Sequence, residues 1–334
     1  LTAIKDYKSI LYSFMAAVVA AFLTACAALA LGVPPVEGLL LAVAFGYGVM
    51  LLWDVILLNR YFPQSDEDPW AFLRWVDRFM PLALTGLATT VGLFSHLVIT
   101  WMGPLGVHVK GLFYGAPYYD VPALLAFLTI LVTTINFVVS VEVNFYPKYR
   151  EYYSLLNDGG TVKDIVTAEK EMLSVLVREL HYTALKQLFV TAVVISLEKS
   201  VLGLLPLGFN DMMHGYFRAL CVGYALYAVG NTVMMILLYF TDYRGALVSA
   251  AAFAVLTTVL SATLYGFGFL LGSSVFLLLA VVRLDMYTGN LPYHVLGEQP
   301  MVARHREGRF ARLGRRLELW DGRLTRAMRG GRRK

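Results

Sequence analysis

Residues 246–264 read ALVSAAAFAVLTTVLSATL, nineteen consecutive residues without a charged side chain. A helix needs about 20 mostly apolar residues to cross the hydrocarbon core of a bilayer, so this stretch predicts a transmembrane helix. Seven other segments have the same character, and we therefore expect an all-α polytopic membrane protein. The eight predicted spans are Ile10–Leu31, Val36–Leu58, Phe79–Met102, Val121–Val143, Gln187–Leu205, Met212–Phe240, Ala246–Leu264 and Phe267–Val282.

The composition of the whole chain agrees with a membrane protein. Of its 334 residues, 58% are hydrophobic and 15% are charged, whereas soluble domains have roughly 45–50% apolar and about 25% charged residues. The net charge of +5 arises in residues 284–334, which hold 12 of the 28 basic and 5 of the 23 acidic residues. These proportions exclude a soluble enzyme, a disordered chain and a disulfide scaffold, and nucleic acid is not an expected partner.

The basic residues also predict the orientation in the membrane. With a cytoplasmic N-terminus, the cytoplasmic segments carry 25 lysines and arginines, and the opposite loops carry only Lys110. Basic residues are concentrated on the cytoplasmic side of inner-membrane proteins. We therefore expect a bacterial inner-membrane protein with both ends of this chain in the cytoplasm.

Two similar tetrapeptides lead into predicted spans six helices apart. Asp242-Tyr243-Arg244-Gly245 precedes the span at Ala246, and Asp6-Tyr7-Lys8-Ser9 precedes the span at Ile10. A six-helix repeat places both copies in the same orientation, related by an axis along the membrane normal. Because two spans follow the start of the second copy, the first predicted span is the fifth helix of its unit. We therefore expect a twelve-helix protein, six plus six, with four helices ahead of this chain.

This plan divides the chain into three parts. Residues 1–78 supply the last two helices of a first bundle and a cytoplasmic linker, and residues 79–283 form the second bundle. Residues 284–334 are a basic cytoplasmic tail, in which apolar side chains recur at helical spacing among arginines. That pattern predicts an amphipathic helix lying on anionic lipid.

The longest polar stretch between spans is 144–186. It contains the turn signal Asn157-Asp158-Gly159-Gly160, followed by Thr161 and Asp164, which resemble a capping box. A cytoplasmic helical hairpin is therefore expected. The aromatic and basic residues of its first half either pack against the bundle or dock a cytoplasmic partner, and both interpretations stay open. These residues are Tyr146, Tyr149, Arg150 and Tyr153.

The same stretch resembles a known family. Residues 142–153, EVNFYPKYREYY, followed by Gly159-Gly160-Thr161, are similar to the Pel exopolysaccharide inner-membrane transporter family, PelG. Pro117–Pro122, Asp242–Gly245 and the segment from Tyr293 to Pro300 are similar as well. The resemblance covers nearly the whole chain to about Met301.

The resemblance implies membership of the multidrug/oligosaccharidyl-lipid/polysaccharide exporter superfamily. It implies export of Pel, a partly deacetylated N-acetylgalactosamine polymer of biofilms, beside a cytoplasmic glycosyltransferase and a cyclic-di-GMP-receptor membrane subunit. A membrane scaffold that recruits the synthesis enzymes, or a small-solute exporter on the same fold, are the alternatives. The sequence has no phosphate loop, nucleophile–base pattern or metal-ligand spacing, so we expect neither an enzyme nor a bound cofactor or metal.

Polar groups inside membrane spans are costly and often line a transport path. Asn231 lies near mid-depth, and Tyr224 and Tyr227 lie one to two turns away. This group could face a sugar, with the rings stacking on its C–H faces, or Asn231 could make an interhelical hydrogen bond. Asn136, which follows two threonines, is a second candidate for either role.

Charged groups in the spans are further candidates for the path. Glu198 and Lys199 lie in the fifth predicted span and require either a water-filled cavity or access to the outer interface. His96 lies near an outer helix end, where an interfacial role is expected and proton coupling is the alternative. The tyrosine-rich outer loop Phe113–Asp120 forms either an interfacial aromatic belt or a polymer exit surface.

Overall fold

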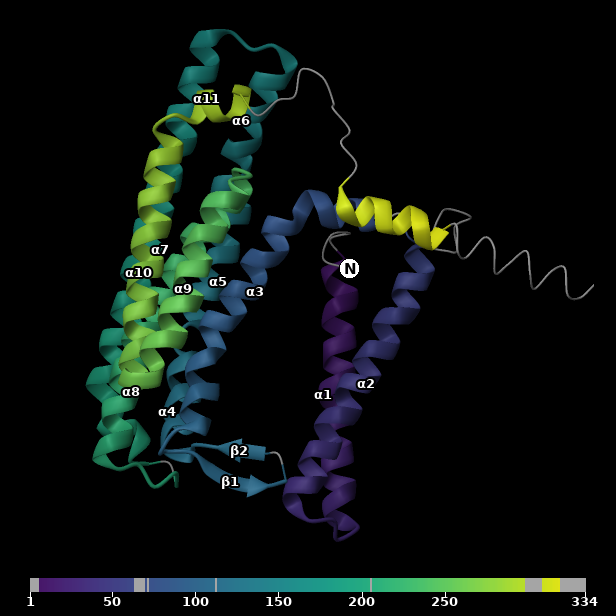
Figure 1. Cartoon of the computed structure of the whole chain (residues 1–334), viewed down its shortest axis with the longest axis vertical. Coiled ribbons are helices and arrows are strands. Elements are labelled where there is room, and N and C mark those ends of the chain that lie inside the picture. The colour runs from purple at the N-terminus through teal and green to yellow at the C-terminus, as the bar shows by residue number, and fades with distance from the viewer. Residues whose placement is uncertain are drawn as a thin grey trace, which may run out of the picture. The chain divides into compact units, whose positions relative to one another are not determined.

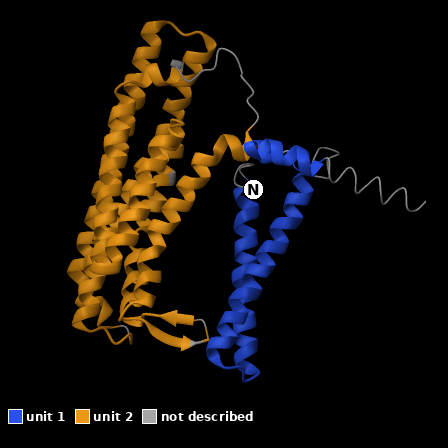
Figure 2. Cartoon of the chain, in the orientation of Figure 1, with its two compact units in different colours: residues 1–74, 309–334 blue, residues 75–308 orange. Residues whose placement is uncertain are grey.

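The computed structural model describes residues 6–62, 70, 72–111, 113–204, 206–297 and 308–318. These residues contain eight helical segments that are long and apolar enough to cross a membrane. The prediction of an all-α polytopic membrane protein is therefore confirmed. The chain divides into two compact units, Leu1–Arg74 with Arg309–Lys334 and Trp75–Gly308, which Figure 2 shows in different colours.

The first unit contains a hairpin of two long helices, α1 (Tyr7–Ala30) and α2 (Pro35–Tyr61). Asp6 caps α1, because its carboxylate accepts a hydrogen bond from the Ser9 amide at 3.2 Å. The Tyr61 hydroxyl, at the end of α2, donates to the same carboxylate at 2.5 Å. The hydrogen bonds from Ser9 and Tyr61 lower the pKa of the Asp6 carboxyl. The start of one helix is thus tied to the end of the next.

The C-terminal tail is described at residues 308–318, of which 309–318 are helical. This segment confirms part of the predicted amphipathic helix, and Phe310 and Leu313 on it are exposed. The remainder of the predicted tail helix lies outside the described residues.

The second unit holds the other elements, which Figure 1 shows in chain order. They are α3 (Leu73–Met102), β1 (Val107–Lys110), β2 (Phe113–Gly115), α4 (Pro117–Leu128), α5 (Leu131–Val139), the π-helix η2 (Ser140–Phe145), α6 (Tyr146–Asp158), α7 (Val162–Leu202), α8 (Asp211–Tyr239), α9 (Tyr243–Leu264), α10 (Gly266–Thr288) and α11 (Leu291–Gly297). The helix α3 starts two residues ahead of this unit.

The helix α3 is kinked at Phe79, whose φ of −107° and ψ of 18° are not helical. Pro81 follows two residues later. Proline lacks an amide hydrogen and its ring collides with the carbonyl four residues earlier, which explains the kink. The predicted span begins at the same residue, Phe79.

The fourth predicted span, Val121–Val143, is not one helix. It is divided among α4, α5 and η2, with a turn at Thr129 and Ile130 between the first two. The β1–β2 hairpin ahead of α4 was also not predicted; its strands are antiparallel, with His108 opposite Tyr114. Strands of three and four residues are too short to give a clear alternating pattern.

The helix α7 confirms the predicted hairpin. The Thr161 hydroxyl accepts a hydrogen bond from the Asp164 amide at 3.3 Å, which caps the helix as expected. With 41 residues, α7 is about 60 Å long and exceeds the roughly 30 Å hydrocarbon core of a bilayer. Its first half, paired with α6, must therefore project from the membrane.

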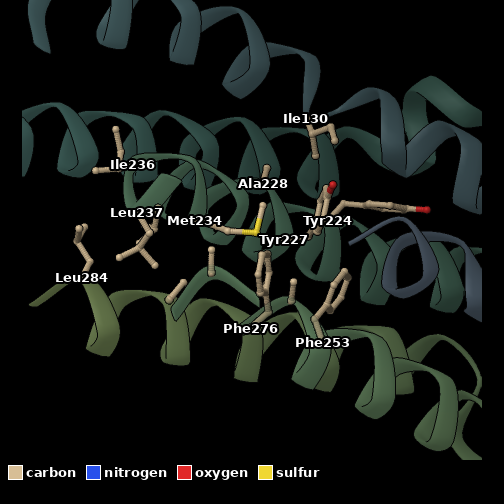
Figure 3. Packing of buried hydrophobic residues seen from close by; sticks show 14 of the residues in the cluster. Ile130, Tyr224, Tyr227, Ala228, Met234, Ile236, Leu237, Phe253, Phe276 and Leu284 are labelled. Carbon is tan, nitrogen blue, oxygen red and sulfur yellow. The ribbon is translucent and has the colours of Figure 1, made fainter. Parts of the chain in front are cut away.

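The core of the second unit is centred on α8, which is the most buried of the candidate spans. The Tyr227 ring of α8 stacks on Phe253 of α9 at 5.5 Å and on Phe276 of α10 at 6.2 Å (Figure 3). Gly268 and Gly272 of α10 bring its backbone against α9, because a Cβ at either position would lie within 2.3 Å of an α9 atom. Glycine is therefore required where these helices cross.

Candidate functional site

The aromatic residues expected to stack on a sugar lie in the packed core. The Tyr227 ring packs against the Phe253 and Phe276 rings, which also stack on each other at 5.0 Å. The Tyr224 ring contacts Phe127 and Phe269 at 5.5 and 4.7 Å. Both tyrosines are less than a tenth exposed. In this conformation neither ring offers a free face to a ligand.

Asn231 lies one turn further along α8 from Tyr227, and its side chain is half-buried. Within the described part of the chain, the Asn231 side chain does not make the interhelical hydrogen bond that was one of its two expected roles. Its neighbour Thr232 is buried, and its hydroxyl donates to the Ala228 carbonyl at 2.9 Å. The Asn231 amide is therefore a polar group on a transmembrane helix that remains available to a ligand.

A row of hydrogen-bonded polar side chains joins α5 to α7, and we call it the α5–α7 polar seam. Asn136 donates to the Thr183 hydroxyl at 2.8 Å and accepts from Lys186 Nζ at 2.5 Å. Thr133 donates to Gln187, whose amide nitrogen donates to Thr191 at 3.1 Å. The seam consists of Thr133, Asn136, Thr183, Lys186, Gln187 and Thr191.

The seam explains how so many polar groups can lie within membrane spans. Gln187 is fully buried and Thr133, Thr183 and Thr191 are nearly so. Each is hydrogen-bonded, which removes the cost of burying an unpaired polar group. Sequence reasoning selected Asn136 but missed Gln187, because the lone glutamine stands at the start of a predicted span.

Glu198 is buried and paired, rather than exposed to a cavity or to the outer interface as expected. Its side chain is 2% exposed, and Oε1 accepts from Arg218 Nε at 2.5 Å. His214 Nδ1 lies 3.6 Å from the same oxygen. A cation on the next helix, here Arg218, can thus stabilise a carboxylate in a span without a cavity or access to the interface.

Lys199, the neighbour of Glu198, is exposed on another face of α7. Successive residues on a helix point about 100° apart, so the two charges do not share a site. The pairing of Glu198 with Arg218 was missed because the two residues lie on different helices, and no local sequence pattern connects them.

His96 is enclosed instead of lying at an interface. Its side chain is fully buried, Nδ1 is hydrogen-bonded to the Tyr119 hydroxyl at 2.7 Å, and Nε2 lies 3.4 Å from the Tyr224 hydroxyl. The Phe269 ring is 4.4 Å away, between ring centroids. One imidazole thus connects α3, α4, α8 and α10 through two tyrosine hydroxyls and a ring contact.

The four hairpin residues proposed for partner docking differ in burial and contacts. The Tyr149 hydroxyl donates to the Tyr239 carbonyl at 3.1 Å, and its ring packs on Tyr153 at 4.4 Å. Both therefore contribute to packing against the bundle. Arg150 is exposed, and Tyr146 is half-buried beside Tyr149.

A cavity of about 610 Å³ lies where α3 meets the β1–β2 hairpin. Aromatic and glycine residues predominate in its lining, with Trp101, Phe113 and Tyr114 supplying the rings. The Trp101 indole donates to both Asp120 oxygens, at 2.8 and 3.0 Å. Sequence reasoning flagged the loop but missed Trp101, which lies at the end of a predicted span.

The two Asp-Tyr-basic motifs have the same local structure. Asp242 caps α9 through the Gly245 amide at 3.0 Å, as Asp6 caps α1 through Ser9. Their backbone angles are also nearly equal, with φ and ψ of −76° and 66° at Asp242 and −84° and 66° at Asp6. The Asp242 carboxylate accepts a hydrogen bond from Arg283 Nε of the next helix at 2.5 Å, just as the Asp6 carboxylate accepts one from the Tyr61 hydroxyl.

Among the described residues, no group of three or more His, Cys, Asp or Glu side chains is placed to hold a metal ion. The described residues offer hydrogen bonds, buried carboxylates paired with arginine at Glu198–Arg218 and Asp242–Arg283, and an aromatic cavity.

Comparison with known proteins assigns the family. Residues 1–296 match the family model PelG, described as "Putative exopolysaccharide Exporter (EPS-E)". No curated protein and no solved structure matches the chain. The match covers most of the chain, including the hairpin and both Asp-Tyr-basic motifs, and its description agrees with eight membrane-spanning helices. The chain is therefore a member of the PelG family of exopolysaccharide exporters.

Proposed function

We propose that this chain transports exopolysaccharide outward across the bacterial inner membrane. The observation that carries the proposal is the PelG family match over residues 1–296 of a chain with eight candidate spans. The substrate is a Pel-type polymer of partly deacetylated N-acetylgalactosamine, supplied by a cytoplasmic glycosyltransferase that acts with a cyclic-di-GMP-receptor membrane subunit. The chain itself acts as a transporter and performs no catalysis.

The α5–α7 polar seam is the proposed wall of the polymer path. Amide and hydroxyl groups of the kind found at Asn136, Gln187 and Thr183 can exchange their mutual hydrogen bonds for bonds to sugar hydroxyls. Asn231, with its half-buried amide, adds a group on α8. Tyr224 and Tyr227 join the path only in a conformation in which α8 separates from α9 and α10. Glu198 and Lys199 lie further along α7, towards the predicted outer side.

The irregular backbone of the fourth span supports this position for the path. Irregular segments of membrane helices often lie near the substrate site of a transporter, and the turn at Thr129–Ile130, whose backbone angles stay close to helical, lies directly ahead of the seam residues of α5. π-helical segments such as η2 also occur often at functional sites.

We further propose a repeat of six plus six helices. In this arrangement α1 and α2 correspond to α9 and α10, as the matching caps at Asp6 and Asp242 suggest. Residues 1–78 then close a first bundle, 79–283 form a second one, and 284–334 extend into the cytoplasm.

Cytoplasmic contacts are assigned to two surfaces. A partner enzyme would reach the hairpin at Arg150 and Tyr146, because Tyr149 and Tyr153 are used in packing. The arginine-rich tail would lie on anionic lipid, which attracts basic amphipathic helices.

The test measures export in cells from which this gene has been deleted, with and without a plasmid that restores it. We expect extracellular polymer with the wild-type chain, and polymer retained inside the cell without it. Purified chain reconstituted with the synthesis enzymes in vesicles tests the scaffold alternative. Transfer of polymer into the vesicle lumen in the absence of this chain would reject the transport proposal.

A further inference from the structure

We propose that the cavity between α3 and the β1–β2 hairpin is a carbohydrate-binding subsite, which holds a short segment of the exported polymer by stacking. This inference rests on the proposed function and adds a binding site to it. The three aromatic side chains that line the cavity are Trp101, Phe113 and Tyr114.

The Trp101 ring is fixed in place before any ligand arrives. Its indole nitrogen donates to Oδ1 and Oδ2 of Asp120 at 2.8 and 3.0 Å. Asp120 is itself held, because Oδ2 accepts the Ala116 amide at 2.7 Å. Because the Asp120 carboxylate that accepts this hydrogen bond is itself held in place, the Trp101 ring loses little conformational freedom on binding. Such preorganisation favours affinity.

The hairpin brings the other two rings to the same cavity. Tyr114 is opposite His108 in the strand register, and the rings of the pair lie 5.1 Å apart. Phe113 and Tyr114 are 76% and 53% exposed. Gly106 allows the chain to turn back on the end of α3, because a Cβ there would lie 1.9 Å from the Trp101 carbonyl oxygen.

The chemistry of the lining matches a sugar. The C–H groups on one face of a sugar ring carry partial positive charge and pack on the negative face of an aromatic ring. The sugar's hydroxyls need hydrogen-bonding groups at the edge of such a platform, and the Tyr114 hydroxyl provides one. A volume of about 610 Å³ lies within the range of small-molecule sites, roughly 300–1,000 Å³.

The position fits the end of the transport route. The positive-inside pattern predicts that the loop between α3 and α4 faces away from the cytoplasm, so a polymer that leaves the bundle on that side would meet this cavity. A lipid headgroup is the competing occupant, because aromatic side chains also gather at membrane interfaces.

The experiment measures binding of a partly deacetylated N-acetylgalactosamine tetrasaccharide to the purified chain in lipid nanodiscs. Saturation-transfer NMR detects sugar protons that lie against protein rings, and a titration gives Kd. The variants are Trp101→Ala, Trp101→Phe and Tyr114→Ala. Tyr118→Ala is the matched control, since Tyr118 is 49% exposed on the neighbouring α4 and does not line the cavity.

We expect Trp101→Ala and Tyr114→Ala to weaken binding by up to about tenfold each, the factor that corresponds to the loss of one aromatic contact. Trp101→Phe keeps a ring and should bind more tightly than Trp101→Ala. Tyr118→Ala should bind like the wild type. Tyr114→Ala distinguishes loss of binding from misfolding, because the exposed Tyr114 side chain is not part of the helix packing and its removal should leave the fold intact.

Two results would overturn the subsite. The first is absence of tetrasaccharide binding to the wild type, or equal Kd values for wild type, Trp101→Ala and Tyr114→Ala. The second is loss of the sugar signal, in wild type and in Tyr118→Ala alike, when short-chain phosphatidylglycerol is added. That result assigns the cavity to lipid. Export by the same variants in cells separates the two proposals: polymer secreted by the wild type, together with equal Kd values for wild type and Trp101→Ala, would reject the subsite and leave export intact.

Discussion

The close crossing of α9 and α10 should make alanine at Gly268 destabilising. A Cβ at this position would lie 2.3 Å from the Ser261 amide nitrogen and 2.5 Å from the Leu260 carbonyl carbon. Both are backbone atoms, so no side-chain rotation can relieve the overlap. The helices would have to separate by more than about 1 Å to restore ordinary van der Waals contact, about 3.5 Å or more between carbons.

The size of the effect follows from two opposing terms. Alanine is favoured over glycine in a helix by about 0.8–1.0 kcal/mol. Forcing an extra methyl group into a packed site costs about 1–3 kcal/mol. Because the obstructing atoms at Gly268 belong to the backbone, we take the upper part of that range, and the net loss of stability is about 1–2 kcal/mol.

Gly215 of α8 is the matched control, because no atom lies within 4 Å of a Cβ built there. Gly215→Ala has the same helix-propensity gain without the overlap, and it should stabilise the protein by up to about 1 kcal/mol. The two variants should therefore differ by about 2–3 kcal/mol.

The assay is unfolding in mixed micelles of increasing SDS fraction, followed by circular dichroism of the helices. Equal midpoints for Gly268→Ala and Gly215→Ala would refute the reasoning, since the crossing would then tolerate a side chain.

Two further predictions concern buried polar groups and use the same unfolding assay. Tyr119→Phe should cost about 1–3 kcal/mol, because it leaves buried His96 Nδ1 without the partner it has at 2.7 Å, whereas exposed Tyr118→Phe should have no effect. Arg218→Met should destabilise more than Lys148→Met, although Lys148 pairs with two glutamates, because only the first removes a hydrogen-bonded arginine from a buried carboxylate. A larger loss for Tyr118→Phe than for Tyr119→Phe, or for Lys148→Met than for Arg218→Met, would contradict these explanations.

The sequence was sufficient for the number and position of the spans because burial in a bilayer requires long, continuous apolar runs. It also predicted the α6–α7 hairpin, since the turn at Gly159 and the cap at Thr161 are local signals. The turn at Thr129–Ile130 was not predictable, because apolar residues continue through it and its backbone angles stay close to helical.

The candidate site was predicted less well, because its geometry depends on pairs that are distant in sequence. Asn136 was selected, but its partner Thr183 lies 47 residues away. Glu198 was expected to need either a cavity or access to the outer interface, whereas Arg218 pairs with it from the next helix. Tyr224 and Tyr227 satisfied the chemistry of a sugar platform, yet their ring faces contact other aromatic residues.

The most direct test of this account is the side of the membrane on which each hairpin lies. Single cysteines at His108 and Glu151, both exposed, are placed in a chain with Cys26 and Cys221 replaced by alanine and treated with a membrane-impermeant maleimide. In spheroplasts of intact inner membrane, we predict labelling of the His108 position at once and of the Glu151 position only after the membrane is permeabilised. Labelling of both positions from the same side would contradict the account.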